Sequence, residues 1–500
     1  MTTRIVCTHG DICAECCALA LSVAQTRTSY TCGVNKSVVI VGAGLAGCLL
    51  AVYLARAGWT VDLRERRGDP RVRGHAAGRS INLAISARGL KALRRAGLEE
   101  TILRNAIRMP GRMIHSRAGA QEFHKYSRDP SHAIQSVSRS ALNLALLEAA
   151  AAEKNVRITF HQRCVEVAAA SGTVIFMDDN TKQTSNVVAD LIVGADGAYS
   201  ALRGIMQKNE GFDYSQEWLG HGYKEMQIQP VTSGAHAPFA MNPNALHIWP
   251  RGASMMIALP NPDGSFTCTL FWPHSGNGSF AEISGAANGR AHFQRDYADA
   301  LPLMPTFDAD FDANPVGSML TVRCNPWSQG GRVVLLGDAA HAIVPFFGQG
   351  ANASFEDCES LTDALATHGD NIAAAFSAYE LDRKRNADAI AEMALTNFVE
   401  MRDKTASRIF KWKKKLDHFL HGVAPNLFTP LYDMVSFSTI PYADALQKSH
   451  KQDAIRIRLA IGSLCCIFLG LRAALDESYF VVLIFGGFFI LSLRAAMRSK

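Results

Sequence analysis

The sequence has no strong excess of charge of one sign. It contains 51 basic and 45 acidic residues among 500, which gives a formal net charge of +6. No concentrated basic face stands out, so nucleic acid is not an expected partner. A chain of this length is too long for one compact core and predicts about three domains. Its hydrophobic content of 48% is sufficient for a large core.

The sequence also lacks a framework of paired cysteines, although it contains 12 cysteines. They form an N-terminal cluster, a pair in the tail and a scattered set with mostly apolar neighbours: Cys7, Cys13, Cys16, Cys17, Cys32; Cys465, Cys466; Cys48, Cys164, Cys268, Cys324, Cys358. This distribution indicates buried thiols in a reducing compartment. The segment CAECC, with His9 before it, has no second cysteine pair at zinc-finger spacing, so no metal site is predicted and zinc is only an alternative.

No secretory signal is visible at the N-terminus. The first residues include two acids, Asp11 and Glu15, and only a short apolar run, ALALSV. A signal peptide needs a longer apolar segment. Residues 1–35 are therefore expected to be a poorly structured extension. A weak transit peptide is the alternative, because the segment contains Arg4, Arg27 and several Ser and Thr residues.

The C-terminal tail has no single apolar run long enough to cross a bilayer unaided. Its two apolar stretches, 459–471 and 479–493, are separated by a short charged link. Each is shorter than the ~20 residues that a spanning helix needs, although flanking residues can extend it. A hairpin would place basic residues on one side: Arg456, Arg458, Arg494, Arg498 and Lys500. We expect a membrane anchor at 456–496; one spanning plus one interfacial segment, or two buried helices, are alternatives.

The first strong signal is a strand, glycine turn, helix and second strand within residues 36–66. In this dinucleotide-binding fingerprint, Gly42 permits the tight turn and Gly44 allows the backbone to approach a pyrophosphate. Gly47 allows the helix to pack closely on the strand. The helix N-terminus offers free N–H groups to phosphates. Glu65 ends the second strand, where a carboxylate binds a ribose hydroxyl.

Two further motifs follow buried strands far along the chain. ADLIVGADGAYSALR contains Asp196, and VVLLGDAAHAIVPFFGQGAN contains Asp338. With the glycine turn, they resemble the aromatic-hydroxylase class of FAD-dependent monooxygenases over about residues 36–442. The resemblance implies that Asp338 binds the ribitol chain of FAD, and that the small residues after it let the flavin lie against the backbone. The N–H groups of 350–352 would hold the negative charge of reduced flavin.

Longer stretches narrow the resemblance. GRSINLAISARGLKALRRAGL, MPGRMIHS, FDYSQEWLGHGYKEM and TNFVEMRDK are similar to the kynurenine 3-monooxygenase family. This resemblance implies hydroxylation of L-kynurenine to 3-hydroxy-L-kynurenine by FAD, NADPH and O₂ through a flavin C4a-hydroperoxide, in tryptophan degradation toward NAD biosynthesis. The NADPH site is not placed, because no second fingerprint is present.

The fingerprint and the resemblance together imply the site residues. Positions expected to contact FAD are Gly42, Gly44, Ala46, Gly47, Arg64, Glu65, Arg66, Arg67, Ala84, Arg139, Cys164, Asp196, Asp338, Gly350, Ala351 and Asn352. Positions expected to contact the substrate are Arg112, Tyr126, Asn397 and Tyr432. A planar guanidinium suits the carboxylate of kynurenine. No side chain is assigned a catalytic role, because the flavin carries the chemistry, and His341 is expected to be structural.

The expected fold class is α/β. A Rossmann-like FAD-binding domain of the glutathione-reductase type carries an inserted β-sheet substrate domain, a C-terminal helical region and a hydrophobic membrane tail. The expected limits are 36–207 and 323–385 for the two parts of the FAD-binding domain, 208–322 for the sheet domain, 386–450 for the helical region and 456–496 for the anchor. The resemblance further implies the mitochondrial outer membrane, with the catalytic part in the cytosol.

Two other functions are compatible with the same residues. One is an FAD-dependent hydroxylase or reductase that acts on a different aromatic substrate. The other is a membrane-tethered adaptor that keeps the flavin fold without catalysis. NADPH consumption that does not respond to L-kynurenine would indicate the first, and purified protein without FAD would indicate the second.

Overall fold

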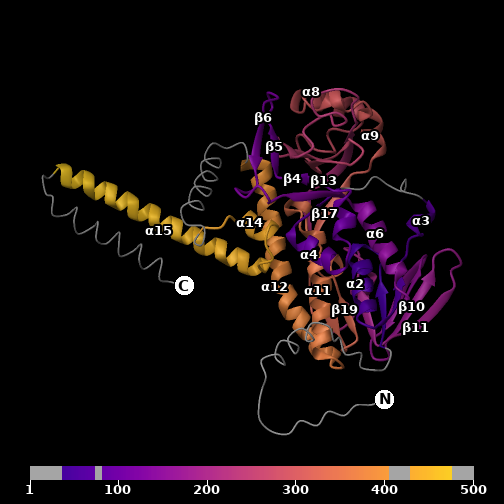
Figure 1. The fold of residues 1–500 in the computed structure, drawn as a ribbon. Helices are drawn as coiled ribbons and strands as arrows, with labels where there is room; N and C mark the ends of the chain where they lie inside the picture. The colour runs from indigo at the N-terminus through magenta and orange to yellow at the C-terminus, as the bar shows by residue number, and fades with distance from the viewer. Residues whose placement is uncertain (1–35, 74–81, 405–427, 476–500) are drawn as a thin grey trace, which may run out of the picture. The chain divides into compact units, whose positions relative to one another are not determined.

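The computed structural model describes residues 36–73, 82–404 and 428–475 (Figure 1). The cysteine-rich extension and the apolar stretch 479–493 lie outside these residues. In the described part of the chain, no helix is both long and apolar enough to span a bilayer. No group of three His, Cys, Asp or Glu residues within that part is placed to hold a metal ion.

A six-stranded sheet forms the centre of the nucleotide fold. Its order is β18 (Ser328–Gln329), β19 (Val333–Leu335), β12 (Leu191–Gly194), β1 (Ser37–Val41), β2 (Thr60–Arg64) and β8 (Val156–Thr159). All neighbours are parallel except β18 and β19. Strands covered on both faces are continuously apolar, which explains the runs VVIV and LIV. The predicted strand–turn–helix–strand unit is confirmed as β1, α2 (Leu45–Arg56) and β2.

Helices from distant parts of the chain pack around this sheet. The core joins α2 and α6 (Arg139–Ala152) to α11 (Gly350–His368), and α11 lies against α12 (Ile372–Val399). Figure 1 shows α11 and α12 side by side. The remaining helices and turns of this part are α3 (Pro70–Arg73), α4 (Ala87–Arg95), α5 (Glu99–Leu103), α7 (Ala201–Met206), α10 (Asp338–His341) and η2 (Pro345–Phe347).

A second, seven-stranded sheet builds the other half of the structure. Its order is β17 (Gly317–Asn325), β13 (Asp213–Ile228), β16 (Phe266–Pro273), β15 (Met255–Pro260), β14 (Leu246–Pro250), β5 (Gly111–His115) and β6 (Gln121–Lys125). Most of it falls in the predicted sheet region 208–322. The strands β5 and β6 lie outside that region in the sequence. They join the sheet because β5 pairs in parallel with β14 and β6 pairs with β5.

Smaller elements complete the described chain. Two three-stranded sheets consist of β3 (Asn82–Ile85), β7 (Ile134–Ser138) and β4 (Ile107–Met109), and of β11 (Thr184–Val188), β10 (Thr173–Asp178) and β9 (Gln162–Ala168). One face of the large sheet is covered by α8 (Ala286–Asp296), η1 (Leu301–Leu303) and α9 (Phe307–Ala313), which share an aromatic core with it.

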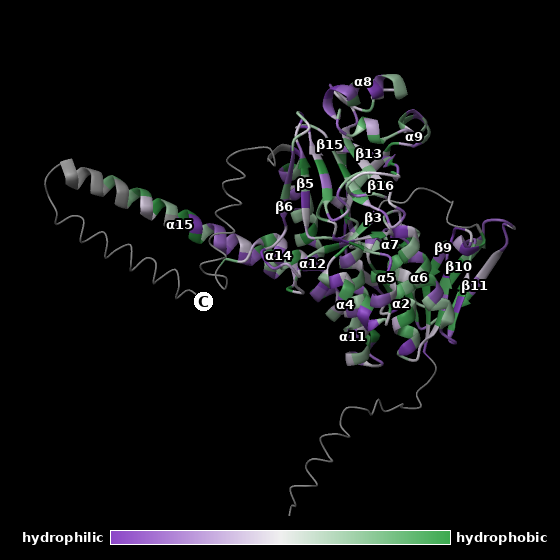
Figure 2. Ribbon diagram, turned by 45° about the horizontal axis from the view of Figure 1, so that its top comes forward, coloured by the Kyte–Doolittle hydropathy of each residue, from purple (hydrophilic) through white to green (hydrophobic). Residues whose placement is uncertain are grey.

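The described C-terminal elements are helical. They are η3 (Glu400–Lys404), α14 (Leu431–Ser436) and α15 (Tyr442–Leu475), and the expected boundary at 386 falls inside α12. The first turns of α15 pack on α12 and α14 through Tyr442 and Ala445. Figure 2 shows a hydrophilic first half of α15 followed by hydrophobic residues farther along.

Candidate functional site

The glycine turn between β1 and α2 owes its three glycines to three different causes. Gly42 has a φ of +103°, and a Cβ there would stand 2.6 Å from the carbonyl oxygen of Ala195. A Cβ on Gly47 would stand 1.9 Å from the carbonyl oxygen of Gly42. A Cβ on Gly44 would meet nothing within 4 Å, and Gly44 lines a cavity. The first two glycines are therefore required by the fold, and the third leaves room for a ligand.

Glu65, at the end of β2, contacts the glycine turn directly. Its carboxylate accepts hydrogen bonds of 2.9 Å from the backbone N–H of Ala43 and from the backbone and side chain of Arg67. Burial alone would raise the pKa of Glu65, but the hydrogen bonds and charge of Arg67 lower it overall. Glu65 is therefore an ionised acceptor beside the turn.

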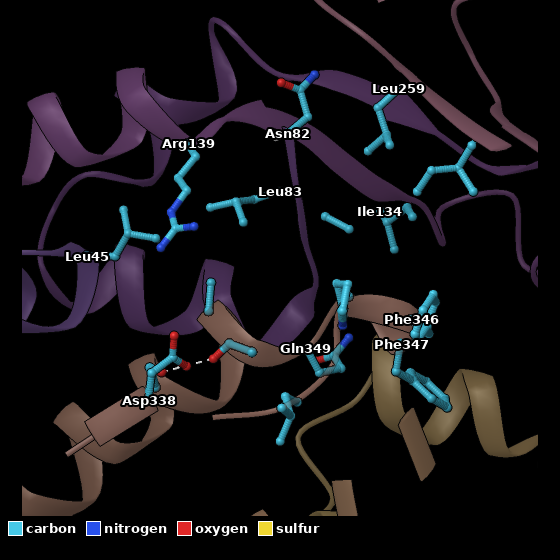
Figure 3. Close-up of a pocket in the computed structure, with 18 of the residues that line it drawn as sticks. Leu45, Asn82, Leu83, Ile134, Arg139, Leu259, Asp338, Phe346, Phe347 and Gln349 are labelled. Carbon is cyan, nitrogen blue, oxygen red and sulfur yellow. Dashed lines mark hydrogen bonds between the residues drawn. The ribbon is translucent and has the colours of Figure 1, made fainter. Parts of the chain in front are cut away.

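A cavity of about 290 Å³ opens at the carboxyl end of the parallel sheet. It is lined from the glycine turn, β3, the turns after β12 and β19, η2 and the large sheet. Figure 3 shows Arg139 and Asp338 toward one end of it, and Phe346 and Phe347 toward the other. Parallel sheets bind nucleotides at this edge.

The polar end of the cavity carries groups suited to FAD. Arg139 and Asp338 line this end, and their side chains make no hydrogen bond or ion pair with the described residues. Arg139 supplies a cation for a pyrophosphate, and Asp338 supplies an acceptor for ribitol hydroxyls. The start of α2 at Gly44 adds N–H groups for phosphate. This donor and acceptor set fits FAD.

The other end of the cavity is apolar. Its wall comes from the first residue of β14, from alternate residues of β15, from β16, and from η2 and η3: Leu246, Met255, Ile257, Leu259, Phe271, Phe346, Phe347 and Met401. Alternate residues of a strand share one face. A flat aromatic ring suits such a wall, because most contacts there are dispersion contacts.

One cation stands at this apolar end. Arg112 of β5 lines the cavity, and its guanidinium carbon is 5.2 Å from the ring centre of Tyr126 and 4.9 Å from that of Tyr432. The two tyrosine rings stack with centres 4.7 Å apart and planes 15° apart. Three of the four predicted substrate residues therefore come together, from β5, from the position directly after β6 and from α14.

These groups leave polar atoms without partners. In the described chain, the Nε of Arg112 and the hydroxyl of Tyr126 are buried and have no hydrogen-bond partner. The charged or polar groups that act on Arg112 there are the two tyrosines, with no acid among them. Burial raises the pKa of the Tyr126 hydroxyl well above its ordinary value, so the group stays protonated and can donate. Because buried polar groups are normally satisfied, this cluster fits an anionic ligand such as a carboxylate.

Two predicted contact residues hold the loop and do not line the cavity. The amide of Asn397 donates to the carbonyl oxygen of Phe346 at 2.6 Å. The amide of Asn352 donates to the carbonyl oxygens of Ala84 and Gly348, both at 2.9 Å, and accepts from the backbone N–H of Ser86. Both amides therefore tie the phenylalanine loop to α12 and β3.

Several predicted FAD positions are placed away from the cavity in the described structure. Arg64 forms a two-pronged ion pair with Asp62, and Arg66 and Arg67 are exposed. Burial raises the pKa of the Cys164 thiol to about 12. Asp196 accepts from two backbone N–H groups in the first turn of α7, whose N-cap residue is Ser200, while Gly197 lines the cavity. By contrast, Ala46, Ala84, Gly350 and Ala351 line the cavity.

His341 belongs to a buried ionic cluster. Its Nε2 lies 2.6 Å from Asp357, whose other oxygen accepts from Arg383 at 2.7 Å. Burial alone would lower the pKa of His341, but Asp357 raises it overall. His341 is not among the described residues that line the cavity, so the geometry agrees with the structural role predicted for it.

The cavity also includes residues that no sequence motif predicts. Asn82 and Leu83 of β3, Ile134 of β7 and Gln349 are among them. Gln349 accepts from the hydroxyl of Tyr442 at 2.9 Å, which links the cavity to the start of α15. The only local feature of the sequence that points to Gln349 is the tripeptide Gly-Gln-Gly in which it lies. No local pattern points to the residues of β3 and β7.

Comparison with solved structures agrees with this fold. An oxygenase of 2-methyl-3-hydroxypyridine-5-carboxylic acid aligns with a TM-score of 0.61 at 21% identity, over 75% of this chain and 94% of that chain. A p-nitrophenol 4-monooxygenase from Pseudomonas putida DLL-E4 aligns with a TM-score of 0.60 at 18% identity, over 78% and 95%. These similarities show an FAD-monooxygenase type of fold.

Sequence comparison is more specific. Residues 35–394 match the family described as FAD binding domain. The kynurenine 3-monooxygenase of Stenotrophomonas maltophilia (strain K279a) is 45% identical over 428 residues, 86% of this chain and 93% of that protein. That of Myxococcus xanthus (strain DK1622) is 48% identical over 86% and 91%. Both relatives are bacterial, so they do not support the mitochondrial location. The chain belongs to the kynurenine 3-monooxygenase family of FAD-binding proteins.

Proposed function

We propose that this chain is an FAD-dependent monooxygenase that hydroxylates L-kynurenine to 3-hydroxy-L-kynurenine with NADPH and O₂. The observation that carries the proposal is the Arg112 cation, which stands without an acidic partner in the described chain beside two stacked tyrosines at the apolar end of an FAD-type cavity. The names of the two relatives support the same substrate.

The residues that hold FAD are proposed from the cavity and the glycine turn. The start of α2 and Arg139 face the pyrophosphate, Glu65 the ribose, and Asp338 the ribitol chain. The backbone of Gly350 and Ala351 faces the flavin. Bound FAD supplies hydride acceptance from NADPH and oxygen transfer from O₂.

The chain itself contributes binding, orientation and exclusion of water. Arg112 pairs with the substrate carboxylate, and the tyrosine hydroxyls donate to it. The aniline ring then lies against the apolar wall, where Phe346 and Phe347 keep water out. Holding the ring in one orientation favours reaction at one ring position.

A different aromatic substrate is the alternative. Purified protein that contains FAD, consumes NADPH faster when L-kynurenine is added, and forms 3-hydroxy-L-kynurenine would support the proposal. NADPH consumption that is indifferent to L-kynurenine would reject the substrate, and a preparation that cannot bind FAD would reject the enzyme.

Asp338→Ala is expected to weaken FAD binding without unfolding the protein. The carboxylate has no protein partner among the described residues, so its loss breaks no internal bond. Hydrogen bonds to a charged group contribute about 1.5–3 kcal/mol, or roughly 10- to 150-fold in affinity. Flavin absorbance after dialysis measures the loss, with Asp308→Ala, which removes an exposed acid, as control. Full flavin occupancy at low FAD would contradict the role of Asp338.

We also propose that the C-terminal segment at 456–496 contacts a lipid bilayer. Four apolar side chains of α15 at helical spacing are 57–67% exposed: Ile457, Ile461, Leu464 and Phe468. An exposed apolar helix face of this kind suits a membrane surface. The apolar stretch 479–493, outside the described residues, follows it after a short charged link.

Deletion after Arg458 is expected to release the protein from membranes with its FAD still bound. The deletion spares Gln452, which is buried, and Arg456, which lies 5.5 Å from the ring of Phe428. Flotation of the full chain and of the truncated chain with lipid vesicles measures the difference. Equal flotation of both proteins would show that this segment is not the anchor.

A further inference from the structure

A second polar contact lies directly behind the tyrosine pair. Tyr126 and Tyr432 stand 306 positions apart in the chain, and so do the residues that follow them, Ser127 and Asp433. The hydroxyl of Ser127 donates to Oδ2 of Asp433 at 2.8 Å. Both side chains are only 7% exposed. A buried hydrogen bond therefore joins the two segments that carry the tyrosines.

The same two segments meet through aromatic contacts. The ring of Phe437, one turn after Asp433, lies 6.3 Å from that of Tyr126 and stacks on His132 at 4.6 Å. His132 places its Nδ1 3.0 Å from the Ser127 hydroxyl. These aromatic contacts close the segments on each other but do not fix their register, because stacked rings slide at little cost.

The Ser127 bond supplies the directional restraint that stacking lacks. Asp433 stands in the first turn of α14, a helix of only six residues. Its carboxylate accepts a charge-assisted hydrogen bond, which is shorter and stronger than a neutral one. Because Tyr432 is the preceding residue of the same turn, the bond sets where its ring lies relative to Tyr126 and Arg112.

We propose that Ser127 and Asp433 are positioning residues for the substrate carboxylate. Neither is among the described residues that line the cavity, so both act through the tyrosines. Their hydrogen bond holds the two rings at the spacing that leaves Arg112 and the Tyr126 hydroxyl open to one anion. The inference rests on the proposed function of the Arg112 site and adds the pair that keeps this site assembled.

The proposal predicts a loss of affinity for L-kynurenine that leaves the other properties of the enzyme unchanged. In Asp433→Asn and in Ser127→Ala, the dissociation constant for L-kynurenine is expected to rise roughly tenfold or more, because a hydrogen bond to a charged group is lost or weakened. The rate at saturating substrate, the FAD content and the unstimulated NADPH oxidation are expected to stay near those of the parent protein. Ser127→Thr keeps a hydroxyl and is expected to retain affinity.

The test uses the FAD-loaded full chain. Substrate affinity is measured by titrating the flavin absorbance with L-kynurenine and with an analogue that lacks the carboxylate. The analogue is expected to bind the parent, Asp433→Asn and Ser127→Ala equally, since the pair serves only the carboxylate site. Ser131→Ala is the matched control, because it removes an exposed hydroxyl that contacts Asp129 in the same loop.

A double variant completes the test. If the two groups act through one bond, Ser127→Ala with Asp433→Asn is expected to lose no more affinity than the more affected single variant. Unchanged L-kynurenine affinity in both single variants, equal losses for the carboxylate-free analogue, or fully additive losses would each overturn the proposal. Arg112→Ala distinguishes a failure of the proposed carboxylate site from a failure of the positioning proposal. If Arg112→Ala retains affinity for L-kynurenine, the carboxylate site itself is misplaced. If Arg112→Ala loses affinity while the Ser127 and Asp433 variants do not, only the Ser127–Asp433 proposal fails.

Discussion

Arg112→Ala is expected to abolish L-kynurenine turnover at ordinary substrate concentrations while FAD stays bound. Arg112 is the cation at the apolar end of the cavity, and its guanidinium stands beside two stacked tyrosines. Removing one partner of a buried charge pair costs on the order of 2–5 kcal/mol, or roughly 30- to several-thousand-fold in affinity. Titration of flavin reduction by NADPH with L-kynurenine measures the loss, and unstimulated reduction is expected to persist.

Two further variants sharpen this result. Arg112→Lys is expected to bind poorly as well, because an ammonium group cannot make the planar two-pronged contact. Arg117→Ala is the control, since Arg117 is exposed and lies 3.5 Å from Asp296. Near-parental affinity in Arg112→Ala would mean that another cation holds the carboxylate. Arg88 is a poor candidate for that role, because it is fully buried and paired with Glu356.

The nucleotide fold was predictable because its signals are local. The apolar run of β1, the glycine turn and the helix α2 follow one another within twenty residues, and each has a distinct sequence pattern. The clash distances at Gly42 and Gly47 give the physical reason for those patterns. The sequence also predicts an acid at the end of β2, and Glu65 lies there and contacts the turn. Its contact with a ribose hydroxyl stays a prediction.

The large sheet and the substrate end were predictable only in part. Arg112 was named through family resemblance, but nothing in the sequence indicates that β5 pairs in parallel with β14, with Arg112 opposite Leu246. The apolar run MMIALP is compatible with a buried strand, and it does not say which face of that strand meets the cavity. That choice depends on contacts between residues more than a hundred positions apart.

Motif residues also proved to be of two kinds. Asp338 faces the cavity without a partner in the described chain, as a ligand-binding acid would. Asp196 sits in an equally clear motif, yet its carboxylate accepts hydrogen bonds from the first turn of α7. A strand-ending acid beside glycine can either bind a ligand or accept hydrogen bonds from the start of the next helix, because both roles require an acceptor at the same edge of the sheet. The position of the next helix decides which of these roles the acid has.

Experiments can distinguish the glycines of the turn that the fold requires from the glycine that only the ligand requires. Gly47 is closed in by the protein itself, since a Cβ would stand 1.9 Å from a backbone oxygen. Gly44 is open: it has an extended backbone, with φ −75° and ψ −173°, and free space where a Cβ would be. Any residue can adopt this backbone, so the need for glycine at position 44 would come from the ligand alone.

Gly47→Ala is therefore expected to destabilise the protein even without FAD, by about 1–3 kcal/mol or more, because backbone must move to accept the methyl group. Gly44→Ala is expected to leave the stability of the FAD-free protein unchanged within about 0.5 kcal/mol. Its affinity for FAD is expected to fall roughly tenfold or more, since the methyl group occupies space that the pyrophosphate needs. Thermal unfolding of both FAD-free variants, followed by FAD titration, gives the two quantities separately. A Gly44→Ala protein that binds FAD as tightly as the parent would show that the cofactor does not approach the backbone here, and the assignment of the polar end of the cavity to the pyrophosphate would be wrong.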